Sequence, residues 1–234
     1  GGRRDFLLLD VIPLALGIET LGGTFSKLIT GNTSLPVEET EIFTTHLDYQ
    51  TAIDINIYQG ERELVKDCRC LGQFKLRNIP PMKAGFPLLE VTFGVDSNGL
   101  LTVSAFEKRS GTEARIEVIP SHGLTRQEID AIMEESLEHV QDDFNQRQLI
   151  EFRQSAERVF RGIEQNWPVA EEVLSSREKE AIRKQMDAVQ KALKKDDSQA
   201  LKSELDSLGD LTRPLADSAM GRAVLAELQD RQVD

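Results

Sequence analysis

The chain has 234 residues, a formal net charge of −12 and 39% hydrophobic residues. An excess of carboxylates repels phosphates, so the composition argues against a nucleic-acid-binding surface and against an anionic membrane face. The longest apolar runs, such as residues 6–9, fall far short of the roughly 20 residues that span a bilayer. Residues 1–12 lack the plan of a signal peptide, so we expect a cytoplasmic protein with one large domain or two modest ones.

The two halves of the chain differ in composition. Residues 1–120 hold 12 of the 16 glycines and 6 of the 8 prolines. The first half has a net charge of −4 and the second a net charge of −8. This shift in glycine, proline and charge predicts a boundary near residue 120.

Four segments of the first half alternate apolar and polar residues with a period of two, the pattern of a strand with one buried face: residues 53–57, 91–95, 101–105 and 116–118. Asn98 and Gly99 favour a tight hairpin turn because both residue types tolerate positive φ. Ser110 and Gly111 indicate a second turn. Short strands at this spacing predict an antiparallel β-sandwich.

The second half is predicted to be helical. Thr125 and Glu128 have the spacing of a capping box, in which each side chain satisfies an orphan backbone donor. Pro168 ends the apolar pattern that follows. That pattern is long for one globular helix, so we expect a bend or two helices in line. Its apolar positions recur with a period of 3.6: Ile129, Ile132, Met133, Leu137, Val140, Phe144, Phe152, Ala156, Val159, Phe160, Ile163 and Trp167.

Three further helix starts are predicted. Ser175 and Glu178 form a second capping box, Asp197 caps a third helix, and Thr212 with Pro214 begins a last one. The helices suggest a small bundle with a projecting arm. The predicted fold class is therefore α+β in two parts: an antiparallel β-sandwich followed by a helical subdomain that ends in a small bundle.

No catalytic motif is present in the sequence. It has no phosphate-binding P-loop, no dinucleotide-binding glycine pattern and no nucleophile elbow. His46, His122 and His139 lack the spacing of a zinc site. One alternative class is a hydrolase whose catalytic groups are two carboxylates. Nothing in the sequence pairs carboxylates in this way, so this is the weakest alternative.

Two short motifs have simple structural interpretations. Cys68 and Cys70 would share one face of a strand, and we interpret them as half-buried thiols rather than a metal site, because a metal site would need further ligands and no His lies nearby in sequence. Residues 96–99 faintly resemble a calcium loop, but Ala105 stands where such a loop needs a bidentate Glu. A hairpin turn explains this segment better.

Several segments resemble the substrate-binding domain of the DnaK family, the 70-kDa heat-shock chaperones. The first is Asp-Val-Ile-Pro-Leu-Ala-Leu-Gly-Ile-Glu-Thr-Leu-Gly-Gly at residues 10–23. The resemblance covers nearly the whole chain and is most specific in residues 10–124. The later segments follow in fixed order: Asn32-Thr33 with Pro36, then residues 59–62, 71–74, 90–105 and 121–124.

The resemblance implies three parts. Residues 1–9 would be an interdomain linker, 10–120 the peptide-binding sandwich and 121–234 the helical lid. The full-length chaperones of the family carry an ATPase domain that uses ATP and Mg, and they work with a J-domain co-chaperone. The ATPase domain is expected outside this chain, so we expect no enzyme activity, no metal and no cofactor here.

The resemblance also implies a site for an extended apolar peptide. Such a peptide adds backbone hydrogen bonds and buries one Leu, Ile or Val side chain, worth roughly 1.5–3 kcal/mol. Residues 53 and 55 share a strand face, as a pocket wall requires, although ordinary sandwich core would show the same period. The implied pocket lining is Ile18, Phe43, Ile53 and Ile55, with Thr20, Thr24 and Thr45 at the rim and Leu21 and His46 as the arch.

A charged latch is expected to hold the lid. Asp48 matches the position that receives the lid in the family, and the facing lid positions hold Glu157, Arg158 and Arg161. We predict an Arg161–Asp48 pair, which would be less sensitive to pH than the histidine that the family carries at this position, because Arg keeps its charge. Ala84 replaces an arginine on the sandwich side of the family's latch, so this latch is weaker or uses Lys83 instead. An exposed pair of this kind is otherwise worth only about 0–1 kcal/mol.

Within the family, residues 61–69 and 11–14 are closer to the HscA type, which serves iron–sulfur cluster assembly. This implies binding to a Leu-Pro-Pro-Val-Lys loop of an iron–sulfur scaffold protein. The alternative is a general DnaK-type domain that binds many unfolded chains. A structural protein whose helices pair between chains is a further alternative class.

Overall fold

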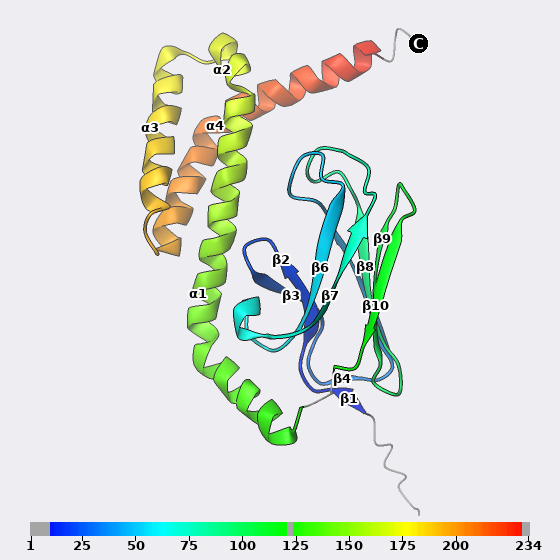
Figure 1. The fold of residues 1–234 in the computed structure, drawn as a ribbon. Coiled ribbons are helices and arrows are strands. Elements are labelled where there is room, and N and C mark those ends of the chain that lie inside the picture. The colour runs from blue at the N-terminus through cyan, green and yellow to red at the C-terminus, as the bar shows by residue number, and fades with distance from the viewer. Residues whose placement is uncertain (1–9, 121–123, 231–234) are drawn as a thin grey trace, which may run out of the picture. The chain divides into compact units, whose positions relative to one another are not determined.

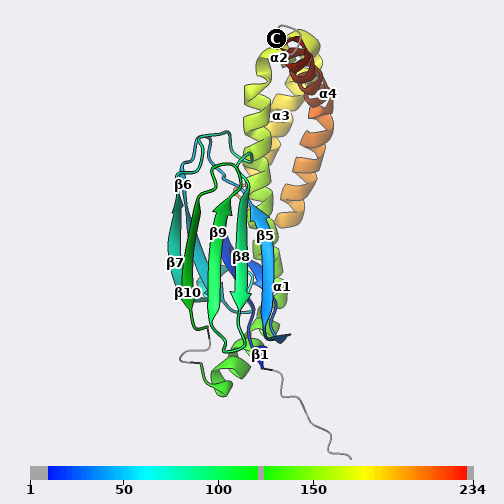
Figure 2. The same cartoon turned by 90° about the vertical axis from the view of Figure 1, so that its right-hand side faces the viewer.

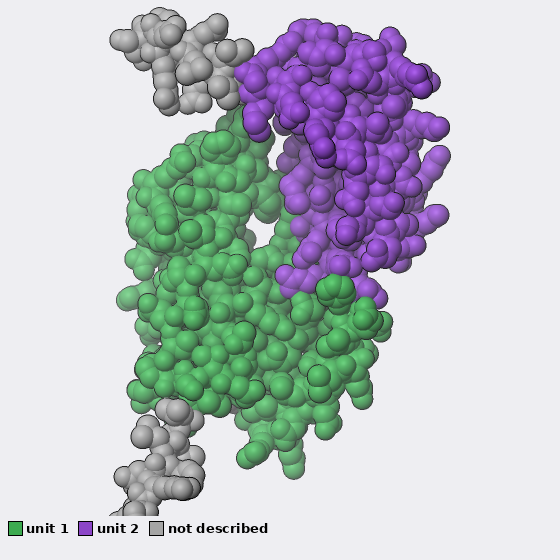
Figure 3. All heavy atoms as spheres, turned by 180° about the vertical axis from the view of Figure 1, so that it is seen from behind, with its two compact units in different colours: residues 1–144 green, residues 145–234 purple. Residues whose placement is uncertain are grey.

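A computed structural model describes residues 10–120 and 124–230, with side chains described as far as residue 222. The linker predicted at residues 1–9 and His122 lie outside the described residues. The chain divides into two compact units, residues 1–144 and residues 145–234 (Figure 3). The first unit contains all the strands and the second contains most of the helical residues.

The first unit is built on two four-stranded antiparallel sheets and one small two-stranded sheet (Figures 1 and 2). One large sheet has the order β3-β2-β6-β7 and the other the order β10-β9-β8-β5. The edge strands β3 and β5 contact each other, as do β7 and β10. The strands are β1 (Val11–Ile12), β2 (Leu16–Thr20), β3 (Thr24–Ile29), β4 (Thr33–Ser34), β5 (Val37–Phe43), β6 (Ala52–Gln59), β7 (Arg69–Arg77), β8 (Leu89–Val95), β9 (Leu101–Glu107) and β10 (Glu113–Val118).

The core of the sandwich follows the alternation in the sequence. Leu89, Val91, Phe93 and Val95 are buried along β8, and the residues between them are half-buried. The four segments predicted as strands all lie in strands, namely β6, β8, β9 and β10. The antiparallel sandwich is therefore confirmed.

The turn between β8 and β9 is longer than predicted. Val95 pairs with Leu101, so five residues connect the strands, and only Gly99 has a positive φ, at 80°. The Asp96 carboxylate accounts for the extra length, because its Oδ1 accepts the backbone N–H groups of Asn98 at 2.8 Å and Leu100 at 2.9 Å. Asp and Asn side chains commonly close turns in this way.

Four α-helices follow: α1 (Arg126–Gln165), α2 (Trp167–Val173), α3 (Ser176–Ala192) and α4 (Ser198–Asp230). Both predicted capping boxes are present, at Thr125 with Glu128 and at Ser175 with Glu178. Asp197 Oδ1 accepts the Ala200 N–H at 2.9 Å at the start of α4, as predicted. The α+β fold class, with a sheet part followed by a helical part, is confirmed.

The helix predicted to begin at Thr212 is not separate. α4 continues through Pro214, and the Thr212 hydroxyl donates to the Leu208 carbonyl at 2.9 Å instead of capping a new helix. Leu208 and Leu215, on either side of the proline, are both buried in the bundle. This packing holds the helix together despite the missing Pro214 N–H, and Figure 1 shows α4 changing direction along its length.

The second unit has its own apolar core. The later part of α1 contributes Leu149, Ala156 and Ile163, which pack with buried residues of α2, α3 and α4. α1 runs without interruption to Gln165, so the predicted break falls at Asn166. The earlier part of the predicted apolar stripe is different, because Leu137, Val140 and Phe144 are exposed.

Candidate functional site

The apolar residues predicted to line a peptide pocket all belong to the core of the sandwich or pack against it. β2 carries Ile18, β5 ends at Phe43 and β6 carries Ile53 and Ile55. Ile18 and Ile55 are each only 3% exposed, whereas Phe43 and Ile53 are half-buried and pack against the same apolar cluster. Two sheets therefore contribute to one apolar cluster whose outer members keep partial access to solvent.

The register of β6 places Ile53 and Ile55 on the same face of the strand. Ile53 pairs with Leu76 and Ile55 pairs with Phe74 on β7, and every second side chain of a strand points to the same face. The loop of residues 44–51 joins the end of β5 to the start of β6. The predicted pocket residues of both sheets are thus linked by one short loop.

The threonines predicted at the rim are held by hydrogen bonds of the β2–β3 turn. The hydroxyl oxygens of Thr20 and Thr24 lie 2.6 Å apart, and the Thr24 hydroxyl donates to the Leu21 carbonyl at 3.3 Å. Gly22 and Gly23 both have positive φ, which lets the turn close tightly. These bonds leave the Leu21 side chain exposed at the tip of the turn.

The loop that carries Thr45 and His46 rests on the loop between β7 and β8. The Gly85 N–H donates to the Thr45 carbonyl at 3.0 Å, the Ala84 N–H donates to Asp48 Oδ1 at 2.9 Å, and the Tyr49 N–H donates to the Met82 carbonyl at 2.6 Å. The Thr45 hydroxyl is buried and has no hydrogen-bond partner among the described residues. The His46 side chain is exposed.

The predicted latch residues fall in different compact units. Asp48 belongs to the first unit, where its Oδ1 accepts a hydrogen bond from the Ala84 N–H. Glu157, Arg158 and Arg161 are exposed on α1 in the second unit. The Arg161–Asp48 pair stays a prediction, as does the use of Lys83.

A buried ion pair within the first unit was missed by sequence reasoning. Arg62 is 8% exposed and Asp143, on α1, is 3% exposed. The guanidinium donates from Nε to Asp143 Oδ2 at 2.6 Å and from Nη2 to Oδ1 at 2.8 Å, and its Nη1 donates to Glu135 at 2.9 Å. This two-point arrangement is the strongest form of a charged hydrogen bond in proteins.

The ion pair shifts both pKa values in the direction that favours the charged forms. The hydrogen bond from Arg62 lowers the pKa of Asp143, and the hydrogen bond to Asp143 raises the pKa of Arg62. The pairing ties residues 126–144 of α1 to the segment after β6. No local pattern predicts it, because the two residues lie 81 positions apart.

The two cysteines differ more than the sequence suggests. Cys68 lies just before β7 and Cys70 lies within it. The prediction of half-buried thiols is confirmed for Cys68 and is wrong for Cys70. Cys68 is half-buried and burial raises the pKa of its thiol to about 11, whereas Cys70 is exposed. Over residues 10–120 and 124–230 there is no cluster of His, Cys, Asp and Glu suited to a metal ion.

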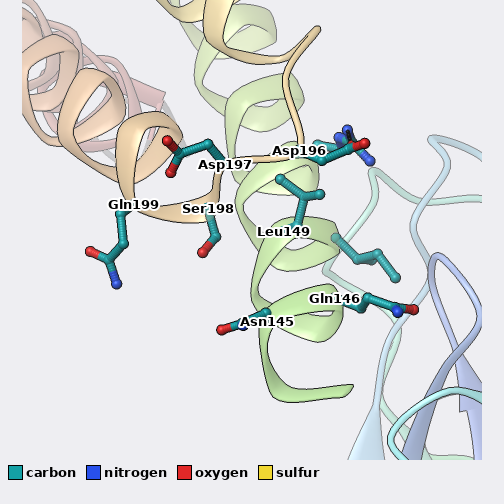
Figure 4. Close-up of a pocket in the computed structure, with 9 residues that line it drawn as sticks. Asn145, Gln146, Leu149, Asp196, Asp197, Ser198 and Gln199 are labelled. Atoms are coloured by element: carbon teal, nitrogen blue, oxygen red, sulfur yellow. Dashed lines mark hydrogen bonds and ion pairs between the residues drawn. The ribbon is translucent and has the colours of Figure 1, made fainter. Parts of the chain in front are cut away.

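A cavity of about 800 Å³ with both polar and apolar walls lies in the second unit (Figure 4). Asn145, Gln146 and Leu149 of α1 line one side. The other side is lined by Asp196 and Asp197, which precede α4, and by the first two residues of α4, Ser198 and Gln199. Arg153, also in the lining, pairs with Asp196 at 2.9 Å. The described lining combines amides, carboxylates, a hydroxyl, the Arg153 guanidinium and two apolar side chains, and it contains no histidine or cysteine.

The sequence of this chain is similar to those of known proteins. Residues 1–221 match the family model described as "Hsp70 protein". The chain belongs to the Hsp70 family.

Curated Hsp70 relatives of this chain carry the name HscA. The chain is 43% identical to "Chaperone protein HscA homolog" of Methylococcus capsulatus and 42% identical to "Chaperone protein HscA" of Klebsiella pneumoniae, in each case over 98% of this chain and 37% of the relative. It is 44% identical to the HscA homolog of Pseudomonas aeruginosa, and this match covers 100% of this chain and 38% of that relative. The chain thus spans somewhat more than a third of the length of these Hsp70 proteins.

No helix within the described part of this Hsp70 chain is long and apolar enough to cross a membrane.

Proposed function

We propose that this chain is the peptide-binding portion of an Hsp70 chaperone, and that it captures an extended apolar segment at one end of the sandwich. The observation that carries the proposal is that Ile18, Phe43, Ile53 and Ile55 all belong to the apolar core of the sandwich, with Phe43 and Ile53 only half-buried, in a chain of the Hsp70 family. The half-buried Phe43 and Ile53 give an incoming side chain apolar atoms to contact. Leu21 and His46 stand exposed on the turns that flank the cluster.

The buried Thr45 hydroxyl supports this proposal. A buried polar group without a partner costs free energy that a hydrogen bond recovers. Thr45 lies two residues beyond Phe43, on the loop that carries His46. A peptide main chain that reaches this loop would give the hydroxyl a partner, while one Leu, Ile or Val side chain enters the apolar cluster.

The finer assignment follows the HscA relatives. We propose that the client is a Leu-Pro-Pro-Val-Lys type loop of an iron–sulfur scaffold protein, under the control of an ATPase domain and a J-domain co-chaperone of the full-length protein. We propose a cytoplasmic setting and no catalysis by this chain itself. A general DnaK-type domain for many unfolded chains is the second candidate, because the apolar cluster and backbone bonding alone do not select one sequence.

The test is a fluorescence anisotropy titration with a labelled Leu-Pro-Pro-Val-Lys peptide. The variant Ile53→Asp places an unpaired carboxylate in the apolar cluster and should abolish binding. Ile42→Asp is the matched control, because Ile42 lies on the neighbouring part of β5 with 54% of its surface exposed. Thermal unfolding of both variants confirms that they are folded.

Equal binding by the wild type and a folded Ile53→Asp variant would overturn the site. A peptide array separates the two candidates. One dominant hit that contains Leu-Pro-Pro-Val-Lys supports the specialist, whereas a broad set of apolar peptides supports the general chaperone domain.

A further inference from the structure

The turn between β8 and β9 contains an asparagine followed by glycine at an exposed position. Asn98 is exposed, and a Cβ added to Gly99 would meet no atom within 4 Å. Asn98 and Gly99 lie in a turn that takes no part in the proposed peptide site. The chemistry of the Asn98 side chain can therefore be considered separately from peptide binding.

An asparagine side chain can react with the backbone of the next residue. The backbone nitrogen of the residue after the asparagine must reach the side-chain carbonyl carbon. Glycine obstructs this approach least because it has no side chain. Asn is among the residues that thermostable proteins avoid for chemical lability. Asn98 is the asparagine of this chain that precedes a glycine.

Asp96 holds both reacting groups. The Gly99 N–H donates to the Asp96 carbonyl at 3.0 Å, and Asn98 Nδ2 donates to Asp96 Oδ2 at 3.4 Å. The other carboxylate oxygen accepts the backbone N–H groups of Asn98 and Leu100. The bond from Leu100 is the main cause that lowers the pKa of Asp96, so the carboxylate stays charged and keeps its hydrogen bonds at neutral pH.

We propose that Asn98 is a site of deamidation through a succinimide, and that Asp96 sets the rate by restraining the turn. The Gly99 nitrogen gives up its proton to a base and forms a bond to Asn98 Cγ. Nδ2 takes up a proton from water or from the protonated base, the Cγ–Nδ2 bond breaks and ammonia leaves. Water opens the resulting ring at one of its two carbonyl carbons, which produces aspartate or isoaspartate, and no oxidation or reduction occurs.

The product would weaken the turn. The lost Nδ2 group no longer donates to Asp96, and the new carboxylate places a second negative charge beside the first. Isoaspartate also adds a carbon to the main chain, which moves the Leu100 N–H away from Asp96 Oδ1. The modification therefore adds a negative charge to a chain of net charge −12 and loosens the start of β9.

The experiment ages the purified chain at pH 6 and at pH 9 and follows Asn98 by peptide mapping with mass spectrometry. Asn56, which precedes Ile57, serves as the internal reference in the same digest. The wild type should deamidate at Asn98 faster at pH 9 than at pH 6, because the attacking nitrogen must lose its proton. Asp96→Ala should react several-fold faster than the wild type in buffer, and Asn98→Ser should show no change in mass at this peptide.

A second measurement separates restraint by the fold from an effect of sequence alone. In concentrated urea the wild type and Asp96→Ala should deamidate at the same rate, because the turn is gone. If Asn98 stays intact at pH 9, or if Asp96→Ala reacts no faster than the wild type in buffer, the proposal is wrong. It is also wrong if the difference between the two persists in urea.

Discussion

Arg62 and Asp143 form a two-point ion pair that fastens the first part of α1 to the sandwich. Both side chains are buried, and Arg62 donates to both carboxylate oxygens. Removing one partner of such a pair leaves an uncompensated buried charge, which typically costs about 3–5 kcal/mol. The pair is therefore a point at which a single substitution should release residues 126–144.

Arg62→Ala should lower the free energy of unfolding of the first unit by about 3–5 kcal/mol. Urea unfolding followed by circular dichroism measures this. Lys75→Ala is the matched control, because Lys75 pairs with Asp54 at 3.1 Å on the exposed surface and should change stability by no more than about 1 kcal/mol. Equal effects of the two variants would show that the buried pair has no special role.

The same pair predicts a dependence on pH. The hydrogen bond from Arg62 lowers the pKa of Asp143 in the folded chain below the unfolded value of about 3.9. The stabilisation is therefore complete above about pH 4 and is lost as the pH falls through the lower pKa of the folded state. Asp143→Asn should be less stable than the wild type at pH 7, and the difference should shrink towards pH 3. A constant difference across that range would contradict the account.

Substitution of glycine by alanine should have opposite effects on stability at Gly17 and at Gly162. A Cβ at Gly17 would lie 1.9 Å from the Ser26 carbonyl oxygen, so Gly17→Ala must push β2 away from β3 and should prevent normal folding. Gly162 lies within α1 with open space around it, so Gly162→Ala should raise the free energy of unfolding by about 1 kcal/mol. Thermal melting of both variants tests this pair. A normally folded Gly17→Ala chain would show that the close approach of the two strands is not required.

Arg161→Ala tests the predicted latch. If Arg161 pairs with Asp48 when the lid closes, its removal should speed the release of bound peptide in a stopped-flow experiment. Arg177→Ala, an exposed arginine of the same unit on α3, controls for loss of positive charge. An unchanged release rate for Arg161→Ala would remove this contact from the account.

The parts of the fold that could be predicted from sequence are those with a local pattern. The alternation around Ile53 and Ile55 predicts β6, and the spacings of Thr125 with Glu128 and Ser175 with Glu178 predict two helix starts. β5 carries no such alternation because most of its side chains are exposed, and we did not predict it from residue pattern.

The errors arose where tertiary packing outweighs local preference. Pro214 is a strong local signal for a break, yet buried leucines on both sides keep α4 continuous. The Arg62–Asp143 pair joins residues that are distant in sequence, so no local motif predicts it. The peptide-site residues came from family resemblance, because period two alone does not distinguish a pocket wall from core.

The most direct test of the peptide site is NMR of isoleucine methyl groups during a titration with the Leu-Pro-Pro-Val-Lys peptide. The account predicts that the Cδ1 signals of Ile18, Ile53 and Ile55 shift together and saturate with the binding curve. Ile182, fully buried in the helical bundle, should not move. Saturable binding that leaves the three sandwich isoleucines unchanged would contradict the account.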